Sequence, residues 1–368
     1  MKKTVLALSL SALFASTAIQ AADIFKTEDG SANFYGQLRT QVEKYQDKDA
    51  TLNAGSSRAG VSAQYAVNDQ FDVLGKVEFG VAFKDGDKYA MENRLHYFGV
   101  SGDFGTVTFG RQWVIADDAY GAEYSYFFGG SALLYSTMSG ARHDSLIKYV
   151  FENDAIWVGA NYGLSEDNSQ SELAELYAKS QVAGIDITAG LGRTSDPDVE
   201  YKDGTNVVKS EVDHTYYSVT LGKGFGDFYL GTTYAADTLS ADASKLDIDR
   251  QGISVAGTWG WAENATAYAG FEYSLNKADT VDGSVKGKNA YVGSDYHFND
   301  WFRVYGEMGW SDGSTLGFAN KSSNVAVSPT TKDGESKFAW VLAYTGNSFL
   351  TSTITNKEAG FSAGFLLR

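Results

Sequence analysis

Cysteine is absent from this 368-residue chain, and proline occurs only twice. A chain without cysteine has no disulfide framework and no thiol chemistry. The two prolines, Pro197 and Pro329, fall in polar segments and interrupt no candidate strand. Long apolar runs are also missing, since the one at residues 4–19 is shorter than the roughly 20 residues that a spanning helix needs. These absences argue against a disulfide-rich domain and against a helical membrane protein.

Net positive charge and histidine clusters are missing as well. The formal net charge is −16, which argues against a nucleic-acid partner. The four histidines lack metal-ligand spacing, no nucleophile motif accompanies His143-Asp144, and no helix follows the glycine-rich residues 222–226. The sequence therefore predicts no metal, no cofactor and no enzyme activity.

A two-residue alternation of side-chain character is the dominant pattern present. Even positions from Phe34 to Val42 are apolar or small, and the odd positions between them are mostly polar or charged. Neighbouring side chains of a β-strand point to opposite faces, so this stretch is predicted to be a strand with one apolar and one wet face. The pattern recurs along most of the chain, with short turns alternating with long acidic loops. It predicts about sixteen antiparallel strands.

Two architectures can use such strands, a soluble β-sandwich and a transmembrane β-barrel. A sandwich would turn its apolar faces toward a dry core. Here the opposite faces carry charged or amide groups in mid-strand, at Arg39, Gln64, Lys76, Glu78, Arg303 and Glu307. Such groups need water, which favours an all-β transmembrane barrel around a wide, wet interior.

The first 21 residues have the organisation of a cleaved secretory signal. Lys2 and Lys3 precede an apolar core, and a small residue, Ala21, ends the cleavage site. Residues 22–347 are predicted to form the barrel as one domain, exported through the periplasm to the cell outer membrane.

One long stretch, residues 116–142, shows no alternation. It is rich in glycine, aromatic and acidic residues, and a connection of this length is commonly functional. Its aromatic side chains make full solvation costly. The stretch is therefore expected to fold into the lumen and pack on the wall.

The residues of this stretch resemble those of a known family. Tyr-Ser-Tyr-Phe-Phe-Gly-Gly at 124–130, with Phe-Tyr-Gly-Gln-Leu-Arg at 34–39 and Arg-Ala-Gly at 58–60, is similar to the trimeric general diffusion porins of Gram-negative outer membranes, vibrio-type members above all. The resemblance covers residues 23 to about 338. It implies a homotrimer in outer-membrane lipid and lipopolysaccharide, with a third external loop that narrows the pore. Phe128, Gly129 and Gly130 match the Phe-Gly-Gly that packs this loop.

The resemblance also implies opposed charges at the constriction. Glu123 matches an acidic position of the loop, while Phe127 replaces the family's second acid and two aspartates nearby are expected to compensate. On the wall, Gln37 stands where the family has a lysine, and an arginine follows two residues later on the same face. The predicted constriction residues are Arg39, Arg58, Arg94, Arg142, Asp117, Asp118 and Glu123.

The implied function is passive passage of small hydrophilic solutes and ions. Opposed charges would create a field across a narrow slot, which disfavours apolar solutes, and the acidic loops favour a weak preference for cations. Two alternatives stay open. One is a solute-specific porin whose loop aromatics stack on oligosaccharide rings, and the other is a non-channel anchor or adhesin with a plugged lumen.

The C-terminal residues depart from the family pattern. Members end on a strand with a final aromatic residue, but alternation here fades after Phe338 and the chain ends Gly-Phe-Leu-Leu-Arg. Back-translation shifted by one base from the codon of Ala339 permits Leu-Gly-Ala-Arg-Leu-Tyr-Trp followed by a stop. Residues 348–368 are therefore expected to be an anomalous tail that is read out of frame.

Overall fold

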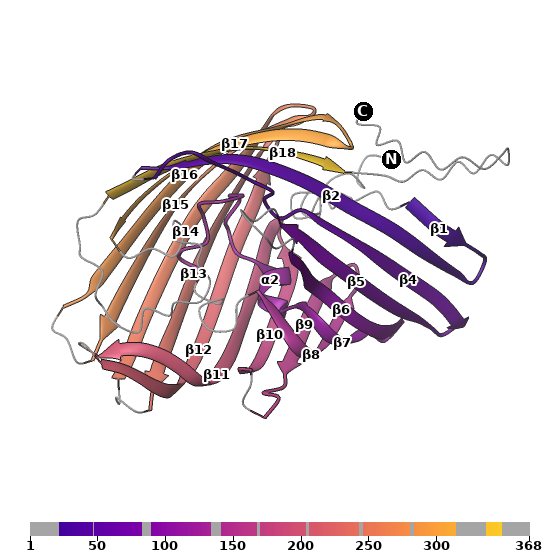
Figure 1. The fold of residues 1–368 in the computed structure, drawn as a ribbon, viewed down its shortest axis with the longest axis horizontal. Helices are drawn as coiled ribbons and strands as arrows, with labels where there is room; N and C mark the ends of the chain where they lie inside the picture. The colour runs from indigo at the N-terminus through magenta and orange to yellow at the C-terminus, as the bar shows by residue number, and fades with distance from the viewer. Residues whose placement is uncertain are drawn as a thin grey trace.

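A computed structural model describes residues 22–347 apart from 47, 83–89, 134–140, 168–169, 204–205, 243–245, 280–282 and 314–335. The predicted signal at 1–21 and the expected tail at 348–368 lie outside these residues. The described residues form one antiparallel sheet of 18 strands, accompanied by the short helix α2 (Ile115–Ala119) (Figure 1). In this part of the chain, no helix has the length and apolar character to cross a membrane.

The strands follow one another along the chain with few irregular connections. The first nine are β1 (Ala22–Lys26), β2 (Gly30–Tyr45), β3 (Thr51–Asn53), β4 (Arg58–Asn68), β5 (Phe71–Ala82), β6 (Ala90–Gly102), β7 (Gly105–Trp113), β8 (Arg142–Glu152) and β9 (Ile156–Gly163). The second nine are β10 (Glu172–Val182), β11 (Ile185–Asp203), β12 (Asn206–Phe225), β13 (Phe228–Ala241), β14 (Leu246–Ala262), β15 (Ala265–Ala278), β16 (Val285–Asn299), β17 (Phe302–Gly313) and β18 (Ser336–Asn347).

Strand pairing follows chain order. From β4 onward each strand pairs with the next, so that β9 pairs with β10, and β18 pairs in turn with β2. The two shortest strands, β1 and β3, pair with β2, which also pairs directly with β4. Without these two, sixteen strands remain among the described residues, in agreement with the predicted number.

Burial on the two faces is the reverse of that in a soluble sheet. On β14, Ile253 and Val255 are 44% and 43% exposed, whereas Ser254 between them is fully buried. On β17, Met308 is 50% exposed and the adjacent Glu307 only 2%. A soluble fold rarely exposes a large apolar surface while burying polar groups, so this arrangement distinguishes the sheet from a soluble one. The predicted alternation of apolar and polar faces is therefore confirmed.

The hairpin of β11 and β12 differs from the prediction. The sequence pattern places strands near 185–192 and 215–223 and assigns the acidic residues between them to a loop, but both strands extend through that region. Pro197 lies inside β11, where the register with β12 shifts between Asp196 and Val199. The expectation that neither proline interrupts a strand is therefore wrong for Pro197. A bulge tolerates proline because the local ladder does not require its missing N–H group.

Candidate functional site

The connection from β7 to β8, here called the β7–β8 segment (residues 114–141, described at 114–133 and 141), begins with α2. This helical turn was not expected in the irregular stretch. The N–H of Ile115 donates to Oδ1 of Asn161 on β9 at 2.5 Å, and the N–H of Ala116 donates to Oε2 of Glu175 on β10 at 3.1 Å. The apolar side of the helix packs with Leu146 of β8. The first N–H groups of the helix, which has no side-chain cap of its own, thus donate to side chains of the neighbouring strands.

Glu307 of β17 binds the middle of the segment. Its carboxylate accepts hydrogen bonds from the N–H groups of Tyr126 and Phe128 at 2.8 and 2.9 Å, and from Oγ of Ser125 at 2.5 Å. The hydroxyl of Tyr268 donates to the same carboxylate at 2.9 Å. One buried acid therefore satisfies two backbone donors of a turn that has no secondary-structure partner.

Glu272 of β15 binds the next residues in the same way. It accepts from the N–H groups of Gly130 and Ser131 at 2.7 and 2.9 Å, and from Nδ2 of Asn289 on β16 at 2.9 Å. Glu272 and Asn289 are completely buried. Hydrogen bonds to a carboxylate are stronger than those between neutral groups, so the wall fixes this part of the segment firmly.

Glycines of the wall leave the space into which the segment packs. A Cβ atom at Gly309 would lie 2.5 Å from Cγ of Phe128, and one at Gly252 would lie 2.1 Å from the carbonyl oxygen of Ala132. At Gly231 it would lie 2.5 Å from the hydroxyl of a tyrosine in the segment. A larger residue at Gly252 would overlap the backbone of the segment, and one at Gly231 or Gly309 would displace a side chain of the segment.

Aromatic rings join the segment to arginines of β2 and β17. Tyr126 and Phe127 lie 4.7 and 5.7 Å from the ring of Tyr305 on β17. The guanidinium of Arg39 lies 6.0 Å from that ring and that of Arg303 lies 5.1 Å from it. Tyr305 therefore contacts both the segment and the basic residues, and Arg303 also reaches the segment directly by donating from Nη1 to the hydroxyl of Tyr126 at 2.9 Å.

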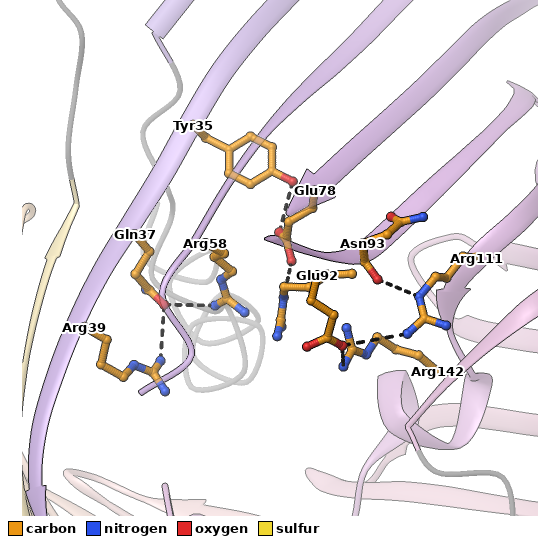
Figure 2. A network of polar contacts seen from close by, with 10 residues as sticks. Tyr35, Gln37, Arg39, Arg58, Glu78, Glu92, Asn93, Arg111 and Arg142 are labelled. Atoms are coloured by element: carbon orange, nitrogen blue, oxygen red, sulfur yellow. Dashed lines mark hydrogen bonds and ion pairs between the residues drawn. The ribbon is translucent and has the colours of Figure 1, made fainter. Parts of the chain in front are cut away.

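Two of the predicted arginines, Arg39 on β2 and Arg58 on β4, lie near one another (Figure 2). Arg39 and Arg58 each donate an Nη2 hydrogen bond to Oε1 of Gln37, at 3.2 and 3.1 Å. Arg94 forms an ion pair of 2.8 Å with Glu78, which also accepts from the hydroxyl of a nearby tyrosine at 3.0 Å.

Arg142, at the start of β8, belongs to a neighbouring group of contacts. Its guanidinium lies 5.2 Å from the ring of Trp113, and that of Arg94 lies 5.6 Å from the same ring. Arg142 also pairs with Glu92 at 3.4 Å (Figure 2). The tryptophan therefore links Arg142 to Arg94.

The predicted acids of the segment have different surroundings. Asp118 on α2 pairs with Lys148 of β8, and its carbonyl oxygen accepts from Nζ of Lys179 on β10 at 2.6 Å. Asp117, the preceding residue on this helix, is partly buried. Glu123 is only 4% exposed and accepts a hydrogen bond from the N–H of Ser125. Its carboxylate is therefore turned into the segment.

Burial, with the charges of Glu272 and Glu307 nearby, raises the pKa of the Glu123 carboxyl well above its usual range. Because the raised pKa belongs to the packed state, protonated Glu123 stabilises the packing, and this contribution is lost as the pH rises through the raised pKa. We expect open-channel current noise to increase as the pH rises above the ordinary pKa range of a glutamate, because the segment then loosens. E123Q should remove this increase, and E263Q, an exchange at an exposed turn, should keep it. An unchanged pH dependence in E123Q would contradict the assignment.

Sequence reasoning missed the residues that hold the segment. It assigned Glu307 to a water-filled interior, and it did not single out Glu272, Asn289 or the three wall glycines. A mid-strand acid at a lumen position gives the same pattern whether it meets water or a buried N–H group. The only signal for this packing in the sequence was glycine at positions 252 and 309, next to polar residues on the lumen side of their strands.

An exposed apolar band, a polar enclosed face and a segment bonded to that face define a strand-built outer-membrane protein. A family model described as Gram-negative porin matches residues 7–327, and the chain therefore belongs to the Gram-negative porin family. It is a diffusion channel of the cell outer membrane, and the family indicates a channel rather than an enzyme.

Individual relatives agree with this membership. The chain is similar to Porin-like protein H of Photobacterium profundum, with 27% identity over 322 residues that cover 85% of this chain and 95% of the relative. The solved structure of in-vitro folded OmpT, an outer membrane protein of Vibrio cholerae, is 42% identical with a TM-score of 0.79, over 89% of this chain and all of that one. A trimer form of OmpT matches with the same identity and TM-score, over 87% of this chain and all of that one.

Proposed function

We propose that the sheet closes into a barrel of sixteen strands around a water-filled lumen. The pairings of β9 with β10 and of β18 with β2 support closure, because they leave each main strand with a partner on both sides. Closure also removes the exposed edges that an open sheet would carry into lipid.

The β7–β8 segment lies inside this lumen and forms the constriction. The observation that carries this proposal is the set of hydrogen bonds from Glu307 and Glu272 to the segment's backbone, because both side chains lie on the polar face. Arg39, Arg58, Arg94 and Arg142 line one side of the remaining passage. Asp117 and Asp118 contribute charge on the other side, and Phe128, Gly129, Gly130 and the buried Glu123 pack the segment.

The chain acts as a homotrimer embedded in outer-membrane lipid and lipopolysaccharide. The trimer form of its 42% identical relative supports this oligomeric state, and the exposed aromatic and aliphatic side chains of the outer face suit both lipid and a second copy. Residues 1–21 serve as the export signal, residues 22–347 form the barrel, and residues 348–368 are the out-of-frame tail.

General diffusion is favoured over binding of a specific oligosaccharide. Stacking on a sugar ring needs solvent-exposed aromatic faces. Phe128, however, is 1% exposed, and Tyr124 and Phe127 pack against the buried cluster that contains it. Only Tyr126, among the described aromatics of the segment, is more than one-third exposed.

Liposome swelling tests these alternatives with purified protein. A general porin should admit sugars at rates that fall smoothly with their size and do not saturate. Saturating entry of one oligosaccharide would support the solute-specific alternative. Liposomes that do not swell even with a pentose would indicate a plugged anchor or adhesin.

A further inference from the structure

An apolar patch lies on the enclosed face of the sheet, near the ends of β13 and β15. It consists of five residues that are between 0 and 6% exposed, namely Val212, Leu239, Ala241, Ile248 and Ala278. Leu239 lies opposite Ile248, which in turn lies opposite Ala278. Ile248 is on the same face of β14 as Gly252, which the β7–β8 segment contacts. The patch therefore faces the lumen, where an open, water-filled mouth would leave it exposed.

Three polar side chains next to the patch are also out of water. The Asp237 carboxylate accepts from Nε of Arg250 at 2.8 Å and lies 2.8 Å from Nε2 of His214. The side chains of His214 and Asp237 are completely buried, and that of Arg250 is 10% exposed. Charged groups that lose contact with water are stable only when they are paired. This pairing allows the wall beside the patch to lie under a cover.

The hairpin of β11 and β12 is long enough to extend past the membrane. Its strands have 19 and 20 residues, whereas about 9–11 tilted residues cross a bilayer. Figure 1 shows the outer ends of both strands curving away from the course of their inner halves. A two-stranded hairpin without support is marginally stable in water. The hairpin end, defined here as residues 196–203 and 206–212, therefore needs a surface on which to pack.

The bulge at Pro197 turns a side chain of the hairpin end toward the patch. Asp196 pairs with the patch residue of β12, whereas Val199 pairs with Ser210, only two positions earlier on β12. The extra residue on β11 reverses the faces of the strand and bends it. Val199 consequently lies on the enclosed face, and it packs against the patch.

We propose that the hairpin end packs on the apolar patch and narrows the outer mouth of the channel, where it acts as a second size filter. The β7–β8 segment covers the wall at Gly252, and the hairpin end covers it from Arg250 outward. A large solute then meets two narrow places in series. The constriction sets the size limit, and the hairpin end slows entry. This inference rests on the proposed function, because it requires a closed barrel with an open passage.

Cysteine labelling tests the packing of the hairpin end without any transport measurement. The chain has no cysteine, so L239C carries a unique thiol. A bulky, water-soluble maleimide should react with the reconstituted L239C about tenfold more slowly than with K209C, because Leu239 is 1% exposed and Lys209 is exposed. V199D places a carboxylate against the patch, so L239C/V199D should react at a rate near that of K209C.

Liposome swelling tests the filter. V199D should raise the rate for a tetrasaccharide relative to a pentose about threefold, because the outer narrowing is removed, and should leave the largest admitted sugar unchanged. T215D is the matched control, since it adds the same carboxylate to the exposed face of β12. V199S should change the ratio less and in the same direction, and it serves if V199D does not assemble.

The two assays separate the possible failures. Equal labelling of L239C and K209C would show that the patch is open, which overturns the packing of the hairpin end whatever the channel conducts. Equal sugar ratios in V199D and T215D would overturn the filter. A wild-type protein that passes no sugar removes the proposed function and the filter with it, whereas slow labelling of L239C would still support the packed hairpin end.

Discussion

Replacing Glu307 by alanine is expected to release the middle of the β7–β8 segment and to give a wider, noisier channel. The substitution leaves the N–H of Tyr126 without its acceptor and removes bonds from Ser125, Phe128 and Tyr268. Unsatisfied buried donors cost roughly 1–3 kcal/mol each, so the packed position should lose roughly 2–5 kcal/mol. A loss of about 3 kcal/mol changes the ratio of packed to released segment about a hundredfold.

Single-channel recordings and limited proteolysis of the segment measure this effect. E307Q keeps one acceptor oxygen and should show a smaller change than E307A. E263A removes an acid of the exposed β14–β15 turn and should match the wild type in both assays. Wild-type conductance, noise and protease resistance in E307A would show that Glu307 does not hold the segment.

Strand positions were predictable because burial on one face imposes a strict period of two. Short turns such as that between Phe225 and Phe228 followed from the same pattern, because the alternation stops there and begins again in the next strand, which runs in the opposite direction. The extension of β11 and β12 was not predictable in this way. Their outer halves carry acidic residues at positions of both faces, and backbone pairing can continue without an apolar face.

The site was predictable to a smaller extent. Arginines at lumen positions could be recognised because a cation in mid-strand needs water or a partner. The partners themselves could not be predicted, because Glu272 and Glu307 bind residues of the segment that are more than 140 positions away in the sequence. Glu123 illustrates the limit: its position in the segment suggested a pore-facing charge, but the turn through Ser125 and Gly129 directs the carboxylate inward.

Gly252 of β14 should tolerate no side chain, and G252V is expected to have a large effect on the packing of the β7–β8 segment. A Cβ atom there would lie 2.1 Å from the carbonyl oxygen of Ala132 and 2.8 Å from its carbonyl carbon. Both atoms belong to the backbone, so no rotamer change relieves the overlap. The segment must move away from its packed position next to Glu272, or β14 must shift against β13 and β15, which fix its register.

The expected result for G252V is a large loss of correctly assembled protein, and a raised, unstable conductance in any channels that form. Overpacking in a tight site typically costs about 1–3 kcal/mol, and an overlap with rigid backbone belongs at the upper end of that range or beyond. G224V is the matched control, because a Cβ atom at Gly224 would meet nothing closer than 3.9 Å. Both variants place the same β-branched residue in a strand, so they share the same change of residue type. If G252V and G224V assemble and conduct alike, Ala132 does not pack against β14, and the β7–β8 segment packs at another place on the wall.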